Sequence, residues 1–167
     1  MKFTTLLALG ILATATACTN ADRFGASGDG AGVSQEGAFG AANDPTSPAY
    51  FNQTIGDRVF FAVDQSTLSA DAEATLTGQA DWLNNNTGYS AIVEGHADEQ
   101  GTREYNLALS ARRAAAAQNF LISRGVAPNR LRSIPYGKEK PVEICSTEAC
   151  YMKNRRAVMV LTAGAGV

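Results

Sequence analysis

Residues 89–125 contain a short apolar run, a polar loop and a long helical pattern in direct succession: YSAIVEGHADEQGTREYNLALSARRAAAAQNFLISRG. The composition of residues 89–95 predicts a strand. Residues 104–124 are rich in Ala and Leu and are followed by Gly125, so we expect a long helix that ends there. The loop between them is polar and contains glycine. Such a loop often binds anions because the first N–H groups of the helix are free.

The alternation of strands and helices continues on both sides of this unit. We expect further strands at residues 58–63, 131–136 and 157–162. Further helices are expected from Ser69 to about Asn84 and from Thr147 to Asn154. The resulting order, β-α-β-α-β-α-β, predicts an α/β sandwich with helices packed on a sheet.

The composition indicates one domain with an appendage. Of the 167 residues, 45% are hydrophobic and 18% are charged, which excludes a fully disordered chain. The net charge of −2 provides no bulk attraction to nucleic acid, so no nucleic-acid partner is expected. One histidine and three cysteines offer little for a soft-ligand metal site, so we expect no metal and no cofactor.

The first 17 residues have the pattern of a secretory signal peptide. Lys2 supplies a positive charge, an apolar run follows, and small residues precede Cys18. The end of this segment resembles a bacterial lipobox, with Ala15 where Leu is usual, and this resemblance implies lipidation of Cys18. The alternative is an ordinary signal peptide with an incidental cysteine. Thr19, rather than Asp, follows the cysteine, which by the same resemblance favours the outer membrane.

Residues 18–50 are predicted to be the lipidated cysteine and a flexible linker. The 32 residues 19–50 include six Gly and seven Ala, with no helical or strand period. Such a segment buries too little apolar surface to offset the entropy lost on ordering. A globular domain over residues 51–167 would therefore be tethered to a membrane and free to reach a partner some distance away.

Asp98 in the loop and Arg113 on the following helix are candidate binding residues. A carboxylate and a guanidinium could together hold the ammonium and the carboxylate of a zwitterionic ligand. The alternative for Arg113 is a structural salt bridge between helix and sheet. Glu94 and His96, together with Asp98, could instead form a metal site or an acid/base set. No arrangement of Ser, Cys and His suggests nucleophilic catalysis.

Several motifs in order along the chain resemble one protein family. They are EGHADEQGTREYNLAL at 94–109, RRA at 112–114, YGKEKP at 136–141 and KNRRAV at 153–158. These motifs are similar to the OmpA-like peptidoglycan-binding domain and, among its members, to the peptidoglycan-associated lipoproteins of the Tol–Pal system. The resemblance covers about residues 59–161. It implies helices on a mixed four-stranded sheet and a non-enzymatic role in envelope integrity and cell division.

The resemblance also implies a ligand, the meso-diaminopimelate residue of the peptidoglycan stem peptide, whose side chain ends in a zwitterion. Asp98 and Arg113 match the family's ligand-binding acid and arginine. The other site positions that match are Tyr105, Asn106, Asp64, Asn154 and Arg155. This sequence departs from the family pattern at Ala62, Gln100 and Arg103, which would lie at the rim of the site.

The implied location is the outer membrane, with the lipid-anchored domain facing the periplasm. The implied protein partner is TolB, a β-propeller that would compete for a surface overlapping the peptidoglycan site. One alternative is an OmpA-like module of another envelope assembly, although no membrane span is evident before the domain. The other is a periplasmic cell-wall hydrolase that uses Glu94, His96 and Asp98.

Cys145 and Cys150 fit no zinc pattern. An oxidising periplasm favours a disulfide between them, with a pair of free thiols as the alternative. Residues five apart within one helix are too distant to be bridged, so Cys145 would have to precede the helix, which Ser146 could cap.

Overall fold

The computed structural model describes residues 42–164. The predicted signal peptide (1–17), Cys18 and the linker up to residue 41 lie outside the described residues. The helices are α1 (Pro48–Tyr50), α2 (Ala70–Asn85), α3 (Arg103–Ser123) and α4 (Glu148–Asn154), with a π-helical turn at Phe51–Gly56 and a 3₁₀ turn at Pro128–Arg130. The strands are β1 (Arg58–Phe60), β2 (Tyr89–Gly95), β3 (Leu131–Pro135) and β4 (Arg156–Ala163).

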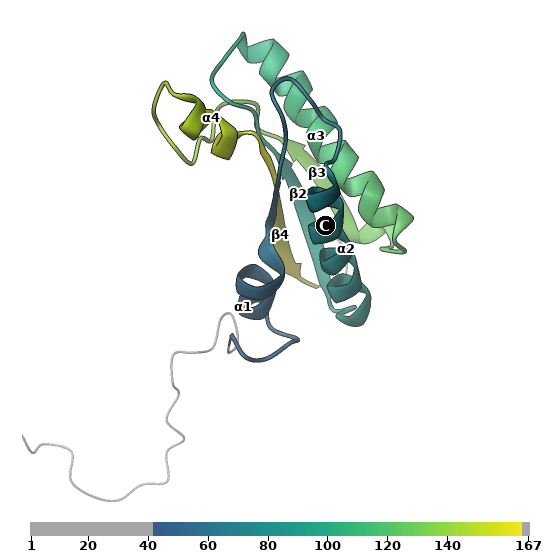
Figure 1. Ribbon diagram of the computed structural model, residues 1–167. Coiled ribbons are helices and arrows are strands. Elements are labelled where there is room, and N and C mark those ends of the chain that lie inside the picture. The colour runs from purple at the N-terminus through teal and green to yellow at the C-terminus, as the bar shows by residue number, and fades with distance from the viewer. Residues whose placement is uncertain (1–41, 165–167) are drawn as a thin grey trace, which may run out of the picture. The chain divides into compact units, whose positions relative to one another are not determined.

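The four strands form one mixed sheet in the order β1-β4-β2-β3. β4 runs antiparallel to both β1 and β2, whereas β2 and β3 are parallel. The parallel pair follows from the long crossover through α3, which returns the chain to the same end of the sheet. The predicted fold class, helices packed on a mixed four-stranded sheet, is confirmed (Figure 1).

The core lies between the sheet and helices α2 and α3. Alternate residues of β2 and β4 face these helices and are buried, among them Ala91, Val93 and Met159. Gly95 at the end of β2 allows α3 to approach closely, because a Cβ atom there would lie 1.9 Å from the Ser110 carbonyl oxygen. This contact places the loop after β2 directly against the amino-terminal half of α3.

The first strand is shorter than the sequence predicts, and it ends at Phe60 rather than at residue 63. The carbonyl group of Ala62 accepts a hydrogen bond from Arg113 (3.1 Å) instead of from a neighbouring strand. Asp64 then adopts a left-handed conformation with φ 56°, which turns the chain away from the sheet. The residues after Phe60 therefore form a loop beside α3.

The structure also corrects the end of the predicted linker, because the domain begins before residue 51. Ser47 caps the short helix α1 by accepting from the N–H of Tyr50, and Phe51 is fully buried. The indole Nε1 of Trp82 donates to the carbonyl oxygen of Pro45 (2.7 Å). Tertiary contacts that a composition argument cannot reveal therefore hold these residues.

None of the helices in the described range is long and apolar enough to cross a membrane.

Candidate ligand-binding site

The loop between β2 and α3 is held at both of its ends. At its start, the N–H of Ala97 donates to the carbonyl oxygen of Gly137 (2.8 Å). At its end, the Thr102 hydroxyl caps α3 by accepting from the N–H of Tyr105 (3.2 Å). Gly101 has a φ of +90°, which the turn into the helix requires. The loop is consequently a fixed platform at the amino end of α3.

A cavity of about 250 Å³ opens beside this loop. Four of the residues that the sequence singled out, Asp64, Asp98, Tyr105 and Asn106, line it, so the fold brings them together. The remaining lining residues are Val63, Gln100, Gly101 and Leu109.

Asp98 is the buried acid of this cavity, with 7% of its surface exposed. Its Oδ1 accepts from the N–H of Gln100 (3.2 Å), and its Oδ2 accepts from Nη1 of Arg155 (3.1 Å). A carboxylate has about four acceptor positions, and these two contacts leave room for a further donor. Nearby, Asn106 donates from Nδ2 to the carbonyl oxygen of Gln100, whereas its buried Oδ1 has no partner among the described residues.

Arg113 lies behind the cavity rather than at its surface. It is fully buried, and its guanidinium donates to three backbone carbonyl oxygens: Gln65 (2.8 Å), His96 (2.9 Å) and Ala62 (3.1 Å). Burial lowers the pKa of Arg113 to about 10, with the carboxylate of Asp98 opposing this shift, so the side chain stays charged at neutral pH. The predicted guanidinium fork onto a ligand carboxylate therefore differs from the observed arrangement, in which the fork holds two loops together.

Arg155 is not among the residues that line the cavity, but it contacts Asp98 and links two carboxylates. Its guanidinium contacts Asp98 and the carboxylate of Glu148, which lies in the first turn of α4, and its Nε donates to the carbonyl oxygen of Phe61. Burial lowers the pKa of Arg155, but hydrogen bonds to Glu148 and Asp98 outweigh burial and raise the pKa above its usual value. None of the sequence motifs pointed to Glu148. An acid near a helix start seven residues before a site arginine was the available signal.

Asn154 is buried and supports the loop before α4 rather than lining the cavity. Its Oδ1 accepts from the N–H groups of Val142 and Glu143, and its Nδ2 donates to the carbonyl oxygen of Glu143. These contacts satisfy the amide, so its relation to the site is through the neighbouring Arg155.

Cys145 and Cys150 of the same segment are joined by a disulfide, with Thr147 rather than Ser146 at the N-cap position of α4.

Of the hydrolase set, the structure brings Glu94 and His96 together, whereas the carboxylate of Asp98 contacts Arg155 instead. Glu94 lies on the face of the sheet away from α2 and α3, because it alternates with the core residue Val93. The His96 ring is 1% exposed and stacks on Tyr136, and neither ring nitrogen makes a hydrogen bond although Glu94 Oε2 is 3.4 Å away. Burial lowers the pKa of His96 to about 3, so the ring is neutral at pH 7. Because the ring is buried, a substrate cannot reach it.

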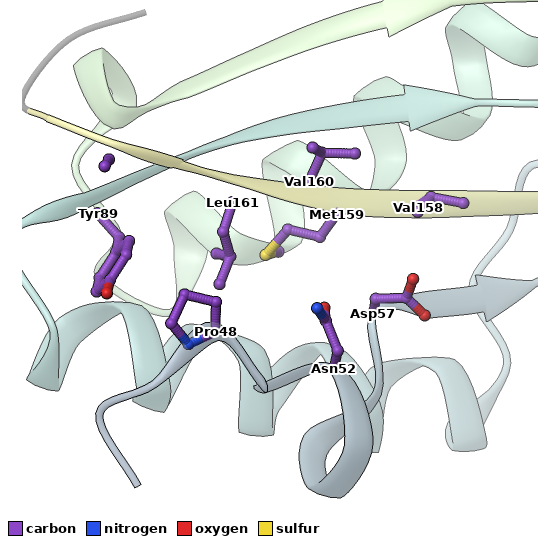
Figure 2. Close-up of a pocket in the computed structure, with 9 residues that line it drawn as sticks. Pro48, Asn52, Asp57, Tyr89, Val158, Met159, Val160 and Leu161 are labelled. Atoms are coloured by element: carbon purple, nitrogen blue, oxygen red, sulfur yellow. The ribbon is translucent and has the colours of Figure 1, made fainter. Parts of the chain in front are cut away.

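A second cavity of about 340 Å³ lies between the α1 region and β4. Figure 2 shows Pro48 and Asn52 opposite Met159 and Leu161 there. It contains none of the predicted site residues, and its carboxylate, Asp57, is paired with Arg58 (2.7 Å). The candidate site is therefore the smaller cavity, which is lined by Asp64 and Asp98. Within residues 42–164, no cluster of three His, Cys, Asp or Glu side chains could hold a metal ion.

Comparisons with known proteins agree with this fold. The OmpA family profile matches residues 60–155. A "Peptidoglycan-associated lipoprotein" of Mesorhizobium japonicum is 58% identical over 127 residues, which cover 76% of this chain and 74% of that protein. A protein of the same name from Haemophilus influenzae is 35% identical and covers 92% of this chain and 94% of its own length.

Solved structures support the same relationship. The crystal structure of the peptidoglycan-associated lipoprotein from Burkholderia pseudomallei has a TM-score of 0.64 and 35% identity, covering 72% of this chain and 98% of that chain. The C-terminal domain of Helicobacter pylori MotB shares the fold, with a TM-score of 0.61 at 23% identity, covering 65% of this chain and 86% of that one. The chain belongs to the OmpA family, among the peptidoglycan-associated lipoproteins.

Proposed function

We propose that this protein is an outer-membrane lipoprotein that binds peptidoglycan without covalent linkage and so tethers the outer membrane to the cell wall. Its relatives carry the name peptidoglycan-associated lipoprotein, and the family is structural rather than enzymatic. The earlier alternative of a cell-wall hydrolase is wrong, because the family is non-enzymatic and His96 is buried.

The ligand that suits the site is the side-chain end of meso-diaminopimelate in the stem peptide. Its ammonium group would donate to Asp98, whose carboxylate faces the cavity and has acceptor capacity left. The buried carboxylate of Asp98 in this cavity is the observation that carries the proposal. Asp64 at the rim adds a second negative charge.

The carboxylate of the same ligand would be favoured by positive charge around the loop. Arg113 lies behind the site, and the amino end of α3 supplies N–H groups and a favourable dipole. Arg113 would favour the ligand carboxylate through its positive charge behind the cavity and through the loops it holds. It would not hydrogen-bond the ligand directly. Tyr105, which is 43% exposed, would cover the bound stem peptide from one side.

We further propose a place in the Tol–Pal system, with TolB as a protein partner. TolB would bind a surface of this protein that overlaps the peptidoglycan site. The support is the resemblance of the motifs around Asp98 and Arg155 to that family. The lipid anchor would be Cys18, and Thr19 after it favours retention in the outer membrane. The protein would then contribute to envelope integrity and cell division.

Co-sedimentation with isolated peptidoglycan tests the proposed function. The full chain, purified from membranes in mild detergent, should pellet with the cell wall, and free diaminopimelate should release it. Asp98→Asn should lower the affinity roughly tenfold to a hundredfold, because a charge-assisted hydrogen bond is lost. Glu139→Gln, which removes an exposed carboxylate paired with Arg103, is the matched control. Pelleting that is insensitive to diaminopimelate and to Asp98→Asn would contradict the site assignment.

A further inference from the structure

Glu148 is an exposed acid that reaches a buried part of the site. Its side chain is 60% exposed, yet its Oε1 accepts from Nη2 of Arg155, whose own side chain is 5% exposed. The other oxygen, Oε2, lies 3.4 Å from Nη1 of the same guanidinium. The contact is therefore two-pronged, the geometry in which an arginine and a carboxylate hold each other most firmly.

The guanidinium of Arg155 is shared between two acids. Its Nη1 donates to Oδ2 of Asp98 (3.1 Å) and also lies within reach of Glu148. The ammonium group of a ligand would have to compete with Arg155 for Asp98. The strength of this competition depends on how much of the Arg155 charge is balanced elsewhere, and Glu148 is the other carboxylate in contact with Arg155.

We propose that Glu148 is a positioning residue that keeps Asp98 available to a cationic ligand group by holding and neutralising Arg155. The inference rests on the proposed function, since it concerns the affinity of the same site for an ammonium group. Without the Glu148 charge, Arg155 pairs with Asp98 alone and repels the incoming cation. The affinity of the site is therefore set partly by a residue outside the cavity.

The segment around Glu148 is built to hold it in this position. Glu148 lies inside the six-residue ring closed by the disulfide between Cys145 and Cys150, whose Cα atoms are 5.9 Å apart. Outside this ring, Lys153 and Glu143 form a separate ion pair (2.9 Å) whose two side chains are largely exposed. The carboxylate of Glu143 contacts Lys153 and not Arg155. Glu143→Gln is therefore a matched control for Glu148→Gln.

Calorimetric titration of the full chain in mild detergent with free meso-diaminopimelate tests the inference. Glu148→Gln should weaken binding about threefold to fivefold, the range of one partly exposed charge contact. Glu148→Asp, which keeps the charge, should recover most of the affinity, and Glu143→Gln should bind like the wild type. A di-N-acetylated ligand, which lacks both ammonium groups, should bind Glu148→Gln and wild type equally.

The outcomes separate the two proposals. Wild-type protein that does not bind diaminopimelate would refute the proposed function, and the role of Glu148 would be refuted with it. Wild-type binding together with unchanged or tighter binding by Glu148→Gln would overturn the role of Glu148 alone. An equal loss for the charged and the acetylated ligand would also overturn it, because a merely structural residue would weaken both.

Discussion

Arg113 lies behind the candidate site and holds two loops together without lining the cavity. Three carbonyl groups from two loops converge on its guanidinium, and its Cζ lies 5.2 Å from the centre of the Phe61 ring. We expect Arg113→Ala to lower the free energy of unfolding by about 3 kcal/mol or more, because it leaves buried acceptors unpaired. Arg113→Lys should recover little of this, since an ammonium group cannot reproduce a planar fan of donors. Urea denaturation measures both effects.

A direct ligand contact by Arg113 predicts a different result. In that case, amidating the side-chain carboxylate of diaminopimelate would weaken binding to the wild type and have no further effect on a folded Arg113→Lys protein. If the residue acts through the loops, the two changes should add. Circular dichroism on the variant confirms that it is folded before the titration.

His96 makes stability depend on pH. Its pKa is lowered to about 3 by burial and by the charges of Arg156 and Lys140, with Glu94 as the nearby acid and the Tyr136 ring stacked against it. In the unfolded chain, His96 therefore takes up a proton near pH 6.5, whereas in the folded protein it does so only near pH 3. Stability is fully present above that pH and falls with acidification, by up to about 1.4 kcal/mol per pH unit below pH 6.

His96→Phe tests this dependence, because it keeps a ring against Tyr136 and removes the titrating group. The two unpaired ring nitrogens make this substitution about neutral in stability at pH 7. Between pH 6 and pH 5, the wild type should lose more stability than the variant in chemical denaturation. Parallel curves for the two proteins would show that His96 is not the acid-sensitive group.

At the scale of elements, the contact between β2 and α3 fixes the position of the loop. Gly95→Ala would place a Cβ atom 1.9 Å from the carbonyl oxygen of Ser110, which is helix backbone and cannot move aside. We expect a loss of about 3 kcal/mol, at the upper end of overpacking effects. Gly88→Ala, where no atom lies within 4 Å of the added carbon, is the control. Equal melting temperatures for the two variants would contradict the close approach.

The disulfide joins Cys150 of α4 to Cys145 in the loop before this helix. Replacing Cys145 and Cys150 by Ser should cost about 2 kcal/mol, the chain-entropy value for so short a ring. Peptidoglycan binding should persist in the variant, weakened no more than by Glu148→Gln. Non-reducing alkylation of periplasmically made protein should leave both thiols unlabelled, whereas rapid labelling of both would show that the bond does not form in the cell.

At the scale of the whole molecule, we predict that the location of the domain depends on Cys18, which lies outside the described residues. Cys18→Ser should release the protein from outer-membrane fractions or leave it unprocessed, because acyl chains supply the membrane affinity. Labelling of the wild type with a palmitate analogue, followed by membrane fractionation, measures this. A wild-type protein with an unmodified mature amino terminus would contradict the lipid anchor.

Local patterns were sufficient for most of the elements. The predicted strand at residues 89–95 matches β2, and the long helix differs from α3 by one residue at each end. The first strand was predicted too long, because a hydrogen bond from Arg113 removes Ala62 from the sheet. The linker was predicted to extend to residue 50, although the domain already includes Pro45. The contacts of Pro45 and Phe51 with Trp82 join residues far apart in the chain, and local patterns do not reveal such contacts.

The sequence alone determined the order of elements, the fold class and the candidate acid Asp98, because periodicity, caps and loop chemistry act between near neighbours. Tertiary structure alone decided that Arg113 is enclosed by three carbonyl groups and that Glu148 reaches Asp98 through Arg155. These contacts span 17 to 57 residues, apart from the local pair of Arg155 and Glu148. The direction and burial of a side chain follow from how distant segments pack, and no local pattern encodes them.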